Sequence, residues 1–171
     1  MKSRTLMAAS LCVLASLSVV AFAQSEAQKS FDKLKTLAGF WAGTYDGTPI
    51  YVSIRVTSTG NAIMHEMTGA EKPDEDENHP LSVFYLEGDR LLLTHYCDVG
   101  NRPRMVAKTT PDGKTVEFAF LDIGNYSSAQ GSHMDHAVFT MLDPNHHTEE
   151  WTAEREGKPP IVGHLDLHRT K

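Results

Sequence analysis

The sequence predicts an all-β protein: an antiparallel, up-and-down β-barrel of about ten strands with one short N-terminal helix. Short segments rich in Val, Ile, Thr, Phe and Tyr recur from Phe40 to Arg169. The segments are separated by tight-turn sequences such as Asp46-Gly47, Gly60-Asn61 and Gly88-Asp89, and tight turns join antiparallel neighbours. Because an open meander leaves two strand edges unpaired, closure into a barrel is the favoured arrangement.

The first 23 residues are expected to be a cleaved signal peptide. Lys2 and Arg4 precede the apolar run Leu6–Val20, and Ala21-Phe22-Ala23 has the small-x-small pattern of a cleavage site. Cleavage after this triplet leaves one domain, residues 24–171, which we expect to be periplasmic or secreted and not inserted in a membrane.

Composition narrows the classes of partner. The chain has a formal net charge of -6, and the expected cleavage removes two positive charges, Lys2 and Arg4, and no negative one. An acidic protein is a poor partner for nucleic acid or an anionic membrane surface. Cys97 is the one cysteine beyond the signal segment, so no intramolecular disulfide is expected and the oligomeric state stays open.

The helix is expected just before the first strand. Apolar residues recur at three-residue spacing over Phe31–Leu37, and Ser25 or Ser30 can cap the helix. Trp41 follows on the first strand, where a large aromatic with one N–H suits the closed end of a barrel.

Three longer connections, 69–80, 99–103 and 123–132, are expected to rim the open end. The strands are expected near Phe40–Tyr45, Ile50–Ser58, Ala62–Thr68, Leu81–Leu86, Arg90–Asp98, Arg104–Thr110, Thr115–Asp122, Asp135–Leu142, His147–Arg155 and Ile161–Arg169.

These features carry a family resemblance. The Gly39-x-Trp41 start and a closing strand that holds Arg169 resemble the lipocalin-like, or calycin, superfamily of small-molecule-binding barrels. The segments LAGFWAGTYDG, LTHYCDVGNRPRM, DGKTVEFAF and HTEEW are similar to a bacterial family of exported lipocalin-like proteins without an assigned activity. The resemblance implies a barrel with a cavity, and it does not imply a particular ligand.

His95 and Cys97 form the pair most suggestive of chemistry. Alternate residues of a strand share one face, so both should point inward with Leu91 and Leu93. The pair could orient a ligand in an apolar cavity, coordinate a soft metal, or act as acid–base and nucleophilic groups of a small enzyme. It could equally be a hydrogen-bonded core histidine beside a cysteine that packs as a small hydrophobe.

The resulting functional expectation is a container for a small apolar or amphipathic ligand, with no catalytic residue and no cofactor assigned. Apolar and aromatic side chains would bury the ligand, and His95, Tyr96 or Arg104 would orient its polar end. The expected ligand-binding residues are His95, Cys97, Tyr96, Met105, Arg104, Trp41, Phe118 and Phe120, with Phe84 as a further part of the wall.

A haem or metal site is the alternative. His164, Asp166 and His168 alternate with leucines on the last strand, so their side chains are expected outside the barrel. However, His164 followed by Arg169 resembles the closing strand of nitrobindins, haem barrels in which a histidine there binds iron. That resemblance implies haem at His164, and His95 is a second metal candidate.

Glu149 is expected on the inner face beside Trp151, where a carboxylate needs a partner. Arg102 and Arg104 are the candidates for that partner. The other histidines near strand ends are expected at the mouth or on the surface: His133, His136, His146 and His147.

Overall fold

The computed structural model describes residues 24–70, 79–108, 113–127 and 131–170. The expected signal peptide, residues 1–23, and most of the expected 69–80 connection lie outside the described residues. No helix in the described part of the chain is long and apolar enough to cross a membrane.

The elements are α1 (Glu26–Lys35), β1 (Gly39–Tyr45), β2 (Thr48–Thr57), the short 3-10 turn Ser58–Gly60, β3 (Ala62–Thr68), β4 (Leu81–Glu87), β5 (Arg90–Tyr96), β6 (Arg102–Lys108), β7 (Thr115–Gly124), β8 (Ser132–Asp143), β9 (His146–Arg155) and β10 (Lys158–Arg169).

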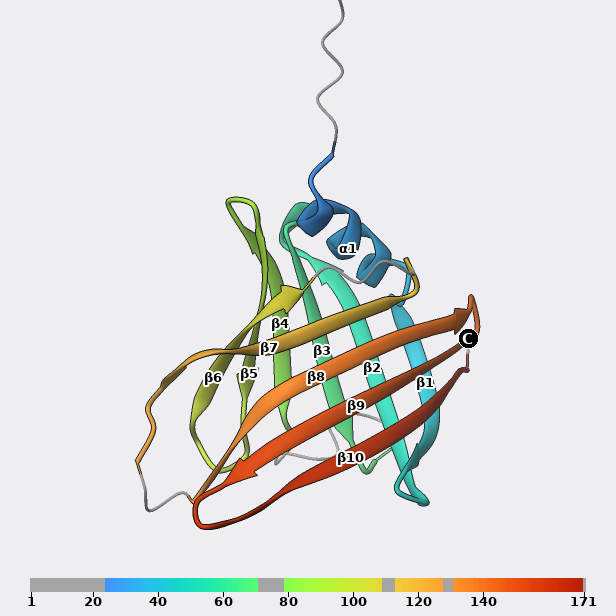
Figure 1. Ribbon diagram of the computed structural model, residues 1–171. Helices are drawn as coiled ribbons and strands as arrows, with labels where there is room; N and C mark the ends of the chain where they lie inside the picture. Colours follow the sequence, from blue (N-terminus) through green and yellow to red (C-terminus); the bar gives the residue numbers. More distant parts are fainter. Residues whose placement is uncertain (1–23, 71–78, 109–112, 128–130, 171) are drawn as a thin grey trace, which may run out of the picture.

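The ten strands form a closed antiparallel barrel in which each strand pairs with the next, which confirms the predicted fold class (Figure 1). Closure occurs between β1 and β10, where Trp41 lies opposite Arg169. Gly43 is required at this seam, because a Cβ atom there would lie 1.8 Å from the backbone oxygen of Asp166. β8 begins earlier than predicted, at Ser132, since a register shift between Met134 and His136 lets it continue pairing with β9.

Helix α1 lies at one end of the barrel (Figure 1). The side chain of Ser25 caps it by accepting a hydrogen bond from the backbone N–H of Gln28 at 3.1 Å. Phe31 and Leu34 point from the helix into the barrel, and both are buried. The helix thus covers the end of the barrel with its apolar face.

Trp41 closes the same end from inside. Its indole N–H donates to the carbonyl oxygen of Leu37 at 2.8 Å, and the guanidinium of Arg169 lies 4.2 Å from the centre of its ring system. Arg169 also donates to the carbonyl oxygens of Ala38 at 2.7 Å and Thr36 at 3.0 Å. The arginine therefore joins the last strand to the segment that follows the helix.

The interior next to this closed end is filled by side chains. The rings of Phe84, Phe118 and Phe139 pack against one another with centroids 5.3 to 6.1 Å apart. Met105 is fully buried in the same core. Phe84, Phe118 and Met105, which the sequence suggested as a ligand wall, are core residues of the closed half.

Candidate ligand site at the open end of the barrel

A cavity of about 320 Å³ lies at the end of the barrel away from α1. Its apolar wall includes Ile50, Met67, Met134, Trp151 and Ala153, and its polar groups include His95, Cys97, Asp98 and His133. These residues come from the strand ends and connections at the lower end of Figure 1. Among the eight expected ligand residues, His95 and Cys97 line this cavity.

His95 lies in β5 and points inward, as the alternation of the strand predicts, with 2% of its surface exposed. Its Nδ1 atom is 2.8 Å from Oγ of Ser82, on the neighbouring strand β4. Its ring lies 5.3 Å from the ring of Trp151. Burial, with a further contribution from nearby His65, lowers the pKa of His95 to about 3. At neutral pH it is therefore an uncharged, firmly held hydrogen-bonding group at the cavity wall.

Cys97 lies immediately after β5, half-buried at the cavity wall. Its backbone N–H donates to the carbonyl oxygen of Asn101 at 3.1 Å, which holds the turn in place. Burial raises the pKa of the Cys97 thiol to about 11, and the neighbouring Asp98 acts in the same direction. Because the thiolate is the form that attacks, this environment keeps the thiol in its unreactive, protonated form near neutral pH.

Two of the expected ligand residues, Tyr96 and Arg104, lie on the outer surface. Tyr96 is 44% exposed, since the neighbour of inward-facing His95 must point the other way. The guanidinium of Arg104 forms a double hydrogen bond with Asp122, with Nε to Oδ1 at 2.7 Å. This outward ion pair lowers the pKa of Asp122 and engages the guanidinium of Arg104 on the outer surface.

Phe120 and Trp41 also lie outside the cavity wall. Phe120 is 38% exposed. It follows Ala119, which is the last residue of β7 that pairs with β8. Its ring packs 5.2 Å from that of His133, which does line the cavity. Trp41 lies at the opposite, closed end of the barrel and does not line this cavity.

A buried carboxylate lies behind the cavity. Glu149 is 1% exposed and accepts hydrogen bonds from Nε2 of His65 at 3.0 and 3.1 Å, Nε2 of His147 at 3.0 Å and Nε1 of Trp151 at 2.9 Å. Burial alone would raise the pKa of Glu149, but the charge of His65 and the hydrogen bonds from His147 and His65 outweigh it and leave the pKa well below its ordinary value. The carboxylate is therefore ionised and held by three N–H donors.

The partners of Glu149 differ from those predicted. Arg104 and Arg102 were the expected partners, whereas the donors are two histidines and a tryptophan. The prediction of His147 at the surface was wrong, because it shares the inner face of β9 with Glu149 and Trp151 at a spacing of two residues. That spacing was the available signal for His147; His65, on β3, is brought to Glu149 only by the closure of the barrel.

Comparisons with known proteins bear on the fold alone. No protein-family model matches the chain, and no curated protein does. Among solved structures, the barrel is similar to the crystal structure of Rv2717c from M. tuberculosis, with a TM-score of 0.54 and 15% sequence identity over 83% of this chain and 98% of that chain. The likeness shows the fold alone, a closed antiparallel β-barrel.

The nitrobindin resemblance placed haem at His164, and the position of this residue does not fit that role. His164 is on the outer face of β10, 62% exposed, with Nδ1 3.3 Å from a carboxylate oxygen of Glu150. The adjacent Leu165 and Leu167 point into the barrel instead. His164 therefore cannot bind the iron of a haem held inside the barrel.

Proposed function

We propose that this protein is an exported barrel that binds a small, mainly apolar molecule in the cavity at its open end. The observation that carries the proposal is the cavity of about 320 Å³ between the filled aromatic core and the mouth. This volume falls at the lower end of the roughly 300–1,000 Å³ range of small-molecule sites. A compact ligand fits such a space better than a long-chain lipid.

The charges around the cavity favour a neutral or basic polar end on the ligand. Among the described residues that line it, none is Lys or Arg, and Asp98 contributes a carboxylate. Arg104, the expected partner for a ligand carboxylate, is engaged by Asp122 on the outer surface. An acidic ligand would place its carboxylate near Asp98, with no lysine or arginine among the described lining residues to pair with it, which is unfavourable.

The wall of the cavity combines a fixed part with an adaptable part. His95 is held by Ser82 and Trp151 by Glu149, so these two rings present a defined surface. Met67 and Met134 line the same space with flexible thioether side chains. A ligand would be oriented by the imidazole of His95 and packed against side chains that can adjust to its shape.

Calorimetric titration with three ligands that share one hydrophobic body, and end in an amine, an alcohol or a carboxylate, tests this proposal. We expect measurable binding of the amine and the alcohol and much weaker binding of the carboxylate. Met67→Trp should abolish binding by filling the cavity. Met64→Trp, on the outer face of the same strand, is the matched control and should bind normally. Equal binding by both variants, or none by the wild type, would contradict the proposal.

Purification from the native host tests export and the natural ligand together. We expect a mature N-terminus at Gln24 and a co-purifying small molecule in native mass spectra. A protein that retains residues 1–23 would contradict the export part of the proposal. A Soret absorption band would show instead that haem occupies the protein.

A further inference from the structure

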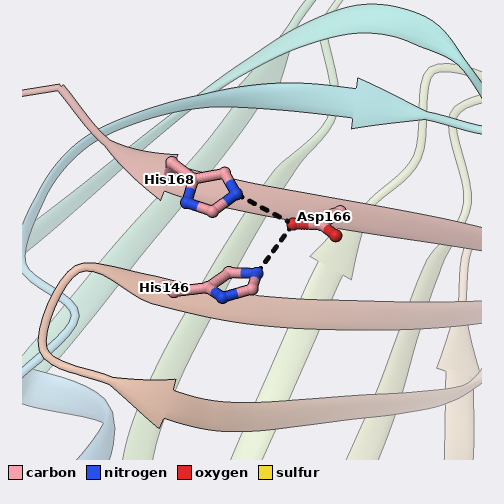
Figure 2. A group of neighbouring side chains, drawn as sticks. All are labelled: His146, Asp166 and His168. Atoms are coloured by element: carbon pink, nitrogen blue, oxygen red, sulfur yellow. Dashed lines mark hydrogen bonds and ion pairs between the residues drawn. The ribbon is translucent and has the colours of Figure 1, made fainter.

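The outer surface of the barrel carries a group of metal-binding side chains that has no part in the cavity. His146 on β9 lies directly opposite His168 on β10, and Asp166 lies two residues before His168 on the same face. Figure 2 shows both imidazole rings facing the carboxylate of Asp166. We propose that His146, Asp166 and His168 form a binding site for a divalent transition-metal ion such as Zn²⁺ or Cu²⁺.

The distances among the donor atoms suit one small ion. Nε2 of His146 is 2.8 Å and Nε2 of His168 is 3.4 Å from the same oxygen, Oδ1 of Asp166. One nitrogen or oxygen atom from each of the three residues lies within 4.8 Å of the others. At metal–ligand distances of about 2.0–2.2 Å, adjacent ligand atoms around one ion are roughly 3 Å apart. A small rotation of the imidazoles therefore brings the three atoms onto one ion.

The strand pairing holds the two rings in place. The rings of His146 and His168 are stacked, with centroids 4.1 Å apart and planes 20° apart. His146 is the more covered of the two, with 26% of its side chain exposed against 65% for His168. The backbone of two hydrogen-bonded strands fixes the spacing of the two histidines. Their side chains therefore lose little conformational entropy when an ion binds.

The donor set selects the class of metal. Two imidazole nitrogens and one carboxylate suit Zn²⁺, Cu²⁺, Ni²⁺ or Fe²⁺, whereas Ca²⁺ and Mg²⁺ prefer sites made of oxygen atoms alone. The exposure of Asp166 and His168 leaves the remaining coordination positions open to water. The site is distinct from the ligand cavity, since none of its three residues lines that cavity.

Titration of untagged, chelator-treated protein with Zn²⁺ and Cu²⁺ tests the site. We expect one ion per chain, no binding of Ca²⁺ or Mg²⁺, and a Cu²⁺ electron paramagnetic resonance spectrum with two coordinating nitrogens. His146→Ala, His168→Ala and Asp166→Asn should each weaken binding by about tenfold or more, because removal of a direct ligand should cost at least as much as the roughly 10–100-fold loss caused by removal of an outer-shell partner. His164→Ala is the matched control, because His164 is on the same face but pairs with Glu150, and it should leave the affinity unchanged.

Three results would overturn the assignment. Unchanged affinity in the His146 and His168 variants would place the ion elsewhere, and a loss of affinity in His164→Ala would do the same. Binding found only in a metal-bridged dimer, detected as an increase in molecular mass with added metal, would contradict a site within one chain. His168→Gln provides a second variant that keeps a long polar side chain, and circular dichroism checks that each variant is folded.

Discussion

The indole N–H of Trp151 donates a hydrogen bond to the buried carboxylate of Glu149 at 2.9 Å. The ring of the same tryptophan forms part of the cavity wall and lies 5.3 Å from that of His95. One side chain thus connects the candidate ligand site to an ionised group in the interior. The position of the cavity wall therefore depends on the charge of a residue that a ligand would not touch.

Replacement of Glu149 with Gln should destabilise the protein by about 3–5 kcal/mol, the range expected when a buried ion pair loses one partner. The amide of Gln carries no charge, and its own N–H group would face the N–H donors of His65, His147 and Trp151, which have no need of another donor. Urea unfolding at pH 7 measures the change. Glu150→Gln, on the outer face of the same strand, is the control, and its free energy of unfolding should change by less than about 0.5 kcal/mol.

The same variant should alter the response to acid. The pKa of Glu149 is lower in the folded protein than its ordinary value of 4.5, so its ionisation stabilises the fold above that pH. This stabilisation is lost as the pH falls from about 4.5 toward the lower folded value. Wild-type protein should lose stability over this range more steeply than Glu149→Gln. Parallel curves for the two proteins would show that Glu149 is not ionised in the fold.

His95 predicts a second, separate pH dependence. Its pKa is about 3 in the folded protein and 6.5 when unperturbed, so between these values the unfolded chain binds one more proton at this site. The contribution of His95 to the free energy of unfolding is fully present above pH 6.5. It falls as the pH decreases below that value, by up to about 1.4 kcal/mol per pH unit. His95→Gln should remove this part of the slope, whereas His164→Gln should retain it. Urea midpoints at several pH values provide the measurement.

Cys97 should be unreactive in the folded protein. Because its pKa is raised to about 11, the thiolate fraction near neutral pH is very small. Alkylation by iodoacetamide at pH 7.5, followed by mass spectrometry, should be much slower for native protein than for protein unfolded in urea. Rapid modification of the native thiol would instead favour the enzyme alternative.

Gly163 controls the shape of the cavity wall through Tyr45. A Cβ atom at Gly163 would lie 2.2 Å from the hydroxyl oxygen of Tyr45, which lines the cavity. Gly163→Ala should therefore displace the tyrosine ring and weaken binding of whichever probe the titrations identify. Gly69→Ala is the matched control at the same cavity, because a Cβ atom there meets no atom within 4 Å. Equal affinities in the two variants would contradict a role for Tyr45.

The alternation of residues along each strand predicted much of this arrangement. It correctly placed His95 inside, His164 outside and Leu165 inside, because neighbouring residues of a strand face opposite sides. The Gly39-x-Trp41 segment likewise indicated the closed end. Where one strand decides the direction of a side chain, the sequence is informative.

The predictions that were wrong or missing concern contacts between strands, which the sequence of a single strand does not determine. Glu149 and His65 are separated by 84 positions and meet only when the barrel closes. The outward pairing of Arg104 with Asp122 depends in the same way on the register between β6 and β7. Phe120 is exposed because the pairing of β7 with β8 ends at Ala119, a feature of two strands rather than one.

The seam between β1 and β10 has a consequence for how the chain folds. Arg169 reaches the backbone of Ala38 across 131 positions, and the strands they belong to are the first and the last. Until β10 is present, the other nine strands can form only an open sheet with β1 and β9 as unpaired edges. Nine of the ten strand pairings join strands that are consecutive in the chain, and the seam alone joins distant ones, so we expect formation of the seam to be a late folding step. A chain truncated before β10 would retain both edges and aggregate by pairing them with other chains.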